Sequence, residues 1–448
     1  MIAAAIIQTA AYWPGIMTWD AIRQYDQALD GGFDDWHPPA MEWLWRQFAL
    51  HLQAGPAPML LLQIALYWAG FGLLARAALN RGRRGLACAL AACGLLPIPF
   101  GLMGSVLKDC QMEGALLSAV GLIVWSGPDR RWWCRVLVIA LLLFASVLRF
   151  NAFLAALPLL VAVLPAAWWR TPLRLGAVSV VGTIILMIAM PIANRLVQAE
   201  PSGVELSLVI FDLGGITEHS GADAFPPLGV RDPVAVNHRC YTPNKWDSYS
   251  WWVDPPCPIG FANVRAALAA RGEHPYVVLA RAILAHPIAY AEHRLTHFNI
   301  NSRFLLHQDT DRPVPNESIP NEWGYIVQSN PALRVIDRIA VISAATPLGW
   351  PIWWMAVAIG GLILSPRLPS RSIVVPLLLS ALLYGLGYLV FSVADEVRYH
   401  MWTMTGTLIG IVFLAGDFVT GARAIRARLL WASALPVLVM ALCVAWRV

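Results

Sequence analysis

Asp20 is the first residue of this chain whose type and setting suggest chemistry. It follows the turn Trp13-Pro14-Gly15 and begins the segment DAIRQYDQAL, which is predicted to form an amphipathic helix along a membrane surface. A carboxylate held there could accept a proton from an attacking hydroxyl group, as a general base does. The alternative is that Asp20 caps this helix, because Asp is common at that position.

Three more polar side chains lie in the same loop, where Asp34, Asp35 and His37 precede two prolines. Two adjacent carboxylates and an imidazole could orient a sugar or hold a divalent cation as a cofactor. Whether a metal binds here stays unknown, because no third ligand stands at a suitable spacing. The same residues are also compatible with a solvated turn.

Three cations are found at the ends of apolar segments. Lys108 is one of only two lysines among 32 Lys and Arg residues, and a compact ammonium at the start of a helix suits a phosphate. Arg149 and Arg398 could each bind phosphate oxygens in a bidentate way. Their neighbours in the sequence are predicted to position the substrate: Asn151, Glu396 and Tyr399.

Each cation also has a structural interpretation. Lys108 could extend to the membrane interface and pair with Asp109, and Arg149 could be an ordinary interfacial anchor. Arg398 could pair with Asp395 or Glu396. These alternatives stay open for each residue taken alone.

The composition indicates which kind of protein must position these residues. Of 448 residues, 58% are hydrophobic and 13% are charged, whereas soluble proteins carry roughly 25% charged residues. Apolar runs recur at lengths near the ~20 residues that a helix needs to cross a bilayer. We therefore predict an all-α polytopic membrane protein that contacts membrane lipids. Its basic residues are scattered, which argues against a nucleic-acid partner.

About eleven transmembrane helices are predicted, of which the first and the fifth are short for a crossing. Their ranges are 1–13, 58–79, 85–103, 109–126, 136–148, 152–168, 175–196, 345–364, 373–393, 401–419 and 430–446. No cleavable signal is expected, because no basic residues precede the first apolar run.

The charges of the short loops predict the orientation. Loops 80–84, 127–135, 168–174, 365–372 and 421–428 are net basic and alternate consistently, so they belong on the cytoplasmic side. All the polar clusters named above then fall on the opposite side. Charged residues at membrane depth are costly and usually functional, although polar residues also gather wherever helix ends meet water.

The predicted organisation has three parts. Residues 1–196 form an N-terminal transmembrane module whose first outer loop, 14–57, carries the candidate acids. Residues 197–344 form an extracytoplasmic α-rich domain, with amphipathic helices near 260–272 and 276–299. Residues 345–448 form the C-terminal transmembrane helices.

Two of the seven cysteines lie in the extracytoplasmic part. Cys240 and Cys257 bound the segment CYTPNKWDSYSWWVDPPC and are predicted to form a disulfide, since that side of a bacterial or secretory membrane is oxidising. A metal site is less favoured, because the pair lacks a matching Cys/His set. The other five cysteines are expected to pack in or beside the spans.

A cationic pocket beside a carboxylate, at the outer membrane boundary, suits a lipid-anchored phosphosugar. The cations would stabilise the negative charge on the departing lipid phosphate while the carboxylate deprotonates the acceptor. A nucleotide is not available outside the cytoplasm, and the sequence has no Gly-rich nucleotide loop.

Several motifs resemble those of the GT-C superfamily of polytopic glycosyltransferases, which includes the protein mannosyltransferases and the lipid A aminoarabinose transferase. The motifs are PGIMTWDAIRQY, DDWHPP, LKDCQ, LRFNAF and EVRYHMW, and the segments IFDLGGITEHSG and CYTPNKWD resemble a bacterial subgroup. In that superfamily the first outer loop carries the catalytic Asp, which would be Asp20 here, with Asp35 as second candidate. The chain lacks the Asp-Glu or Asp-X-Asp pair expected directly after the first span.

The resemblance implies an inverting glycosyltransferase in the bacterial inner membrane, with its active site facing the periplasm. The donor would be a polyprenyl-phosphate-linked sugar, and the acceptor an extracytoplasmic glycan, lipid or protein. The alternative is a transporter or flippase of an anionic lipid or polysaccharide. Transporters commonly place their sites near the midplane between internal repeats, and no convincing repeat is present.

Overall fold

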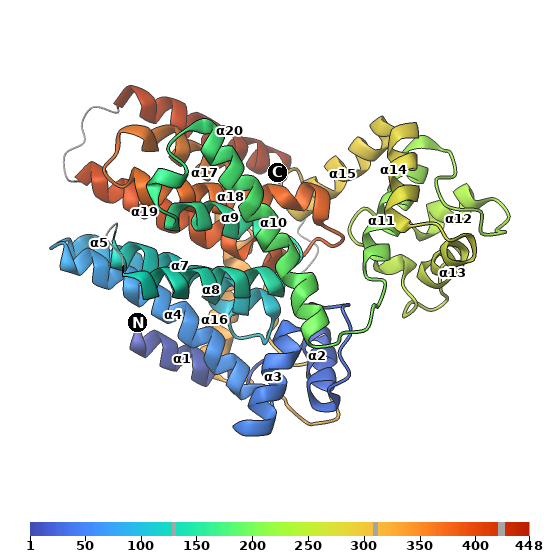
Figure 1. The fold of residues 1–448 in the computed structure, drawn as a ribbon, viewed down its shortest axis with the longest axis horizontal. Coiled ribbons are helices and arrows are strands. Elements are labelled where there is room, and N and C mark those ends of the chain that lie inside the picture. Colours follow the sequence, from blue (N-terminus) through green and yellow to red (C-terminus); the bar gives the residue numbers. More distant parts are fainter. Residues whose placement is uncertain (128–130, 308–311, 420–425, 448) are drawn as a thin grey trace.

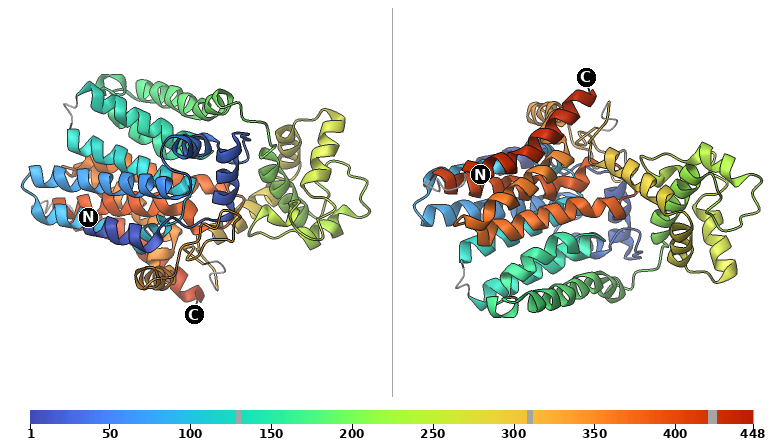
Figure 2. Two further views of the ribbon diagram at one scale, coloured as in Figure 1. Left: turned by 90° about the horizontal axis from the view of Figure 1, so that it is seen from below. Right: turned by 90° about the horizontal axis from the view of Figure 1, so that it is seen from above.

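The structure is a computed structural model that describes residues 1–127, 131–307, 312–419 and 426–447. Every regular element in these ranges is helical, and the only β pairing there consists of two isolated bridges. The predicted all-α class is confirmed. Figures 1 and 2 show an elongated helical bundle with a smaller helical body at one end and the α4–α5 connection at the other.

The bundle is formed by helices from both ends of the chain. They are α1 (Ile2–Tyr12), α4 (Ala57–Asn80), α5 (Arg84–Cys93), α6 (Pro97–Leu102), α7 (Lys108–Ser126), α8 (Trp132–Leu148), α9 (Phe153–Val163), α10 (Pro172–Leu196), α16 (Pro331–Ala344), α17 (Pro351–Leu364), α18 (Arg371–Phe391), α19 (Met401–Val419) and α20 (Arg426–Arg447).

The chain is a multi-pass membrane protein. Five helical stretches within the described ranges are long and apolar enough to cross a bilayer: Ala57–Asn80, Pro172–Leu196, Arg371–Phe391, Val397–Val419 and Arg428–Arg447. Each of the eleven predicted segments contains a helix, but some helices are shorter than predicted. The number of crossings therefore stays a prediction.

Prolines explain two of the shortened segments. The predicted span 85–103 is divided between α5 and α6, because Pro97 lacks an N–H and begins a new helix. The predicted span 152–168 ends as an α-helix at Val163, two residues before Pro165. Helix α1 has 11 residues, so it is only about 16 Å long and too short to cross alone.

Helix α7 lies at the centre of the N-terminal half and packs along α4. Its residues from Asp109 to Val124 are all buried. The two helices approach closely at two glycines: a Cβ added to Gly121 would lie 2.7 Å from the carbonyl oxygen of Gly70. Small residues of this kind allow the backbones of membrane helices to touch. Helix α7 is thereby held firmly, with Lys108 at its first turn.

Helix α10 stands at the edge of the bundle, against α8 and α9. Most of its apolar side chains are exposed, among them Val180, Ile184 and Ile188. A helix that is apolar all round and exposed in this way is suited to contact lipid.

The first outer loop folds into two short helices, α2 (Trp19–Asp30) and α3 (Ala40–His51), which pack together. Thr18 caps α2, since its hydroxyl accepts a hydrogen bond from the amide N–H of Ala21 at 3.3 Å. Tyr25 is buried against Trp45, with ring centroids 5.0 Å apart. These contacts fix the direction in which the first turn of α2 points.

The smaller body consists of α11 (Glu205–Ser220), α12 (Pro233–Cys240), α13 (Phe261–Arg271), α14 (Pro275–Ala285) and α15 (Pro287–Asn301) around a hydrophobic core of its own. The helix predicted near 276–299 is divided at His286, because Pro287 starts α15. Helix α16, which lies inside the predicted segment 197–344, packs against α1 and α6 of the bundle.

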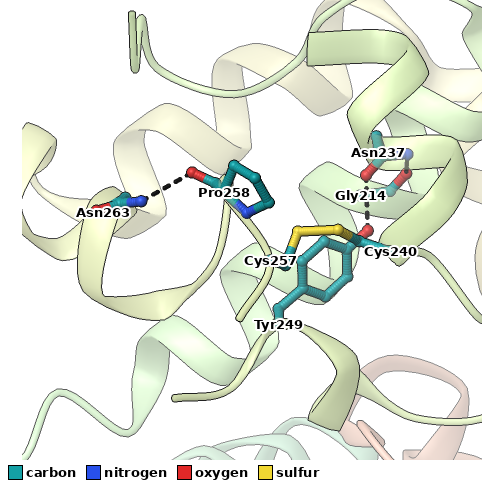
Figure 3. Close-up of a disulfide and its surroundings, with 7 residues drawn as sticks. All are labelled: Gly214, Asn237, Cys240, Tyr249, Cys257, Pro258 and Asn263. Carbon is teal, nitrogen blue, oxygen red and sulfur yellow. Dashed lines mark hydrogen bonds between the residues drawn. A yellow bond between two sulfur atoms is a disulfide. The ribbon is translucent and has the colours of Figure 1, made fainter. Parts of the chain in front are cut away.

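The predicted disulfide between Cys240 and Cys257 is present, with Cα atoms 6.1 Å apart (Figure 3). Beside it, the Tyr249 hydroxyl donates to the Asn237 side chain at 2.6 Å, and Asn237 donates to the carbonyl of Gly214 at 2.9 Å. The loop between the two cysteines is therefore tied to α11 and α12.

Candidate active site

One cavity of about 740 Å³ lies where the bundle, the first outer loop and the smaller body meet. Its walls come from segments that are hundreds of residues apart in the sequence. The lining includes nine of the residues predicted from sequence: Asp20, Asp35, His37, Lys108, Arg149, Asn151, Glu396, Arg398 and Tyr399.

Asp20 lies in the first turn of α2 and forms an ion pair with Arg398, with Oδ2 3.0 Å from Nη1. The alternative that Asp20 caps its helix is wrong, because Thr18 occupies the cap position. Burial opposes ionisation of Asp20, but the charges of Arg398 and Lys108 outweigh it and lower the pKa of the carboxyl below its ordinary value. Asp20 is therefore a carboxylate at neutral pH.

His37 lies between Lys108 and Asp20. The Lys108 ammonium donates to Nδ1 of His37, and Nε2 of the same ring is 3.8 Å from Oδ1 of Asp20. Burial and the neighbouring Lys108 charge lower the pKa of His37 to about 3, so the ring is neutral. A neutral ring that accepts at Nδ1 carries its proton on Nε2, on the side of Asp20.

Arg149 forms an ion pair with Asp109, whose side chain is 1% exposed. Its guanidinium also lies over the ring of Tyr399, 4.4 Å from the centroid. Asp109 thus pairs with Arg149, while Lys108 turns to His37. These contacts hold the Arg149 side chain at the cavity wall rather than at a lipid-facing interface.

Arg398 has two acidic partners, Asp20 and Glu396. The predicted structural pairing with Glu396 is therefore present, and it coexists with a second contact across the cavity. Because a planar guanidinium has five N–H donors, it can serve two carboxylates and still face a ligand.

Asp34 is the predicted site residue that the cavity does not include. Its carboxylate forms an ion pair with Arg23 and accepts hydrogen bonds from Gln27 and from the backbone N–H of Trp36, both at 2.9 Å. These bonds shape the turn that carries the next residues. The contacts of Asp34 therefore stabilise the turn of the first outer loop.

Asp35 lines the cavity, but its carboxylate is engaged by the chain that leads into the smaller body. Its Oδ1 accepts hydrogen bonds from both the backbone N–H and the hydroxyl of Ser202, each at 2.6 Å. That oxygen is therefore occupied by Ser202, whereas the Asp20 carboxylate faces Arg398 in the cavity. Asp20 is the better candidate of the two.

The acids of the first outer loop do not come together as a metal site. Within the ranges that the structure describes, no three His, Cys, Asp or Glu side chains form a group that could hold a metal ion. Asp20 and His37 instead face Arg398 and Lys108.

Comparison with known proteins finds one solved structure with a low similarity to this chain. No known family profile matches the chain, and no curated protein matches it. Among solved structures, the chain is similar to ArnT from Cupriavidus metallidurans, in a crystal structure bound to undecaprenyl phosphate. The identity is 14%, the TM-score is 0.34, and the similarity covers 95% of this chain and 78% of that one.

Sequence reasoning named none of the tryptophans of the cavity as site residues. Trp36, Trp246 and Trp252 line it together with the carboxylate of Asp247. In a chain with 21 tryptophans, single Trp residues carry little information. The signal that could have found them is local density, because the disulfide loop alone contains the sequence WDSYSWW.

Another wall of the cavity is mostly apolar, although Asn194 and Arg195 at the end of α10 also line it. Its apolar residues come from the last three turns of α10, the start of α9 and the end of α18: Leu186, Met187, Met190, Phe153 and Phe391. The cavity thus has an apolar end at the exposed helix α10, a cluster of cations and acids, and an aromatic end at the smaller body.

Proposed function

We propose that this chain is a glycosyltransferase of the GT-C type, which moves a sugar from a polyprenyl-phosphate-linked donor to an extracytoplasmic acceptor. One observation carries the proposal: the carboxylate of Asp20, several cationic side chains and a mostly apolar wall share one cavity at the end of a membrane bundle. The resemblance of the sequence motifs to that superfamily supports it.

The distribution of apolar and cationic side chains suggests one orientation for the donor in the cavity. Its lipid tail would lie against the apolar wall at α10, and its phosphate would reach Lys108, Arg149 and Arg398. Guanidinium groups bind phosphate oxygens through paired hydrogen bonds, and the ammonium adds a point charge. The sugar would then lie beside Asp20 and His37.

Asp20 would act as the general base in an inverting transfer. The acceptor hydroxyl attacks the anomeric carbon, and its proton passes to Asp20. The bond between that carbon and the phosphate oxygen breaks, and the phosphate departs with the electron pair. The three cations stabilise the charge that it gains.

The ion pair with Arg398 would make the basicity of Asp20 depend on donor binding. A donor phosphate that takes up Arg398 would draw the guanidinium away from Asp20. Losing its counter-charge would raise the pKa of the Asp20 carboxyl and make it a stronger base. The base would therefore be weak until the donor is in place.

The cavity would face the periplasm of a bacterial inner membrane. Two arguments support this side: the net basic loops are predicted to be cytoplasmic, and the disulfide loop beside the cavity is suited to an oxidising compartment. Residues 197–344 would be extracytoplasmic.

The test is mass spectrometry of polyprenyl-phosphate sugars in membranes of a host that lacks the native copy. We expect one donor species to fall when the wild type is expressed and to accumulate with Asp20→Asn, because that amide cannot take the acceptor proton. Asp26→Asn is the matched control, since Asp26 is exposed on the same helix. It should behave as wild type.

Equal donor pools with wild type and Asp20→Asn, in folded protein and with acceptor present, would remove Asp20 as the base. If the wild type itself leaves every donor pool unchanged but moves lipid across the membrane, the transporter interpretation replaces the transferase.

A further inference from the structure

We propose that the disulfide loop 240–257, together with Trp36, forms a subsite for a carbohydrate chain, so that the acceptor is a glycan. This proposal rests on the proposed function and adds the class of acceptor. The pyranose face would stack on Trp252, and sugar hydroxyls would donate to the carboxylates of Asp247 and Asp35.

The loop is fixed at several points, which a recognition surface requires. Its ends are joined by the disulfide, and Tyr249 is fully buried beneath it (Figure 3). Its middle is fastened to the bundle, because the backbone N–H of Trp246 donates to the carbonyl of Val393 at 3.0 Å and Asn244 donates to Asp395 at 2.9 Å. The loop therefore belongs to the cavity wall.

The aromatic residues form one cluster that joins the first outer loop to this wall. The ring of Trp36 lies 5.7 Å from Trp246, 5.0 Å from Trp251 and 6.1 Å from Trp252, measured between centroids. Contacts between tilted and edge-on rings hold each indole in a fixed orientation. Trp252 keeps 49% of its surface exposed, so part of this residue stays accessible to a ligand.

The composition of this end suits a sugar better than an acyl chain. The C–H face of a pyranose carries partial positive charge and stacks on the negative face of an indole, while its hydroxyl groups need acceptors around the ring. Trp252 and Trp246 stand here beside two carboxylates, Asp247 and Asp35. The apolar side chains that suit an acyl chain are gathered at the α10 end.

The chain offers a closely matched pair of variants. Trp251 and Trp252 are adjacent, are both 49% exposed and belong to the same cluster, but only Trp252 lines the cavity. A role in anchoring the body to lipid headgroups would involve both residues equally. A role in binding a ligand inside the cavity involves Trp252.

The experiment measures binding of chitotetraose, cellotetraose and mannotetraose to the full detergent-solubilised chain by saturation-transfer difference NMR. We expect at least one tetrasaccharide to bind, Trp252→Ala to weaken its affinity about tenfold, and Trp251→Ala to change it less than about twofold. Trp252→Phe should restore part of the affinity, since it keeps an aromatic face.

This readout needs neither donor nor turnover, so it is independent of the proposed reaction. Tetrasaccharide binding through Trp252 without any sugar transfer would sustain the subsite and remove the transferase. The proposal is overturned if no tetrasaccharide binds, or if both alanine variants lose affinity equally.

Discussion

Asp20, His37, Lys108 and Arg398 form a connected set of charges and hydrogen bonds before any ligand is bound. The predicted phosphate-binding cations are not free in this state. Arg398 is held by two carboxylates and Arg149 by one. On the proposed function, a donor phosphate would compete with these internal partners, and this competition would link donor binding to the ionisation of Asp20.

The lowered pKa of Asp20 predicts an unusual pH profile. If the proposed function holds, kcat/KM should show no acidic limb from Asp20 between about pH 4 and about pH 8, because the carboxyl is ionised throughout. Removing the positive charge in Arg398→Gln disfavours the carboxylate, so its pKa rises. We expect an acidic limb to appear within this pH range in Arg398→Gln.

The measurement is kcat/KM against pH for the wild type and for Arg398→Gln. Each profile is scaled to its own maximum, so that the weaker donor binding of Arg398→Gln does not affect the comparison. Arg46→Gln serves as control, because Arg46 donates to the carbonyls of Ala28 and Leu29 at the far end of α2. Profiles that superimpose after scaling would mean that Arg398 does not set the ionisation of Asp20.

Some site residues could be read from the sequence and others could not. Lys108 was conspicuous because lysine is rare in this chain, and Arg398 because it lies in a polar run between apolar segments. Asp34 was misleading, since adjacent carboxylates give no sign of which one faces a cavity. Trp252 was missed because stacking depends on ring orientation, which only tertiary packing determines.

At the scale of elements, the position of α7 decides where the site can be. Its N-terminus carries Lys108 and Asp109, and its body is packed on all sides. The apolar run from 109 to 126 predicted this helix well, but not the close contact with α4. That contact depends on which faces the two glycines Gly70 and Gly121 present to each other.

We expect Gly121→Ala to destabilise the protein by roughly 1–3 kcal/mol, the usual range for an overpacked interior. The added Cβ would lie 2.7 Å from a backbone oxygen of α4, which cannot move aside as a side chain could. Gly72→Ala is the control, because a Cβ on that residue of α4 has no neighbour within 4 Å.

The measurement is the thermal unfolding midpoint in detergent, followed by circular dichroism. Equal unfolding midpoints for Gly121→Ala and Gly72→Ala would show that α4 and α7 can move apart without a loss of stability.

The segments that sequence reasoning drew too long have a common physical cause. Hydropathy responds to side chains, whereas helix ends depend on backbone N–H groups. Pro97 and Pro287 interrupt runs that remain apolar or amphipathic on both sides. Their positions were visible, but proline is also tolerated inside membrane helices, as Pro158 and Pro376 are here.

At the scale of the whole molecule, loop charge alone predicted that distant polar clusters share one face. The cavity gathers nine of those residues, which is the strongest agreement between sequence and structure. The orientation of the molecule in the membrane is a separate matter and remains a prediction that topology mapping can test.

We expect Ala270→Cys to react with a membrane-impermeant maleimide on intact spheroplasts, and Arg84→Cys to react only after permeabilisation. Both positions are exposed, at opposite ends of the molecule. A Cys88→Ser background removes the exposed native thiol. Labelling of Arg84→Cys on intact cells would invert the proposed topology.

The bond between Cys240 and Cys257 has a consequence for biogenesis. The two cysteines are 17 positions apart in the sequence, and the loop between them supplies Trp246, Asp247 and Trp252 to the cavity wall. The helices of the bundle can insert as they leave the ribosome, but on the proposed topology this wall can be completed only after export, when the two thiols are oxidised. The protein would therefore mature in two stages, and the host's oxidative folding machinery would determine when an inserted chain becomes a working enzyme.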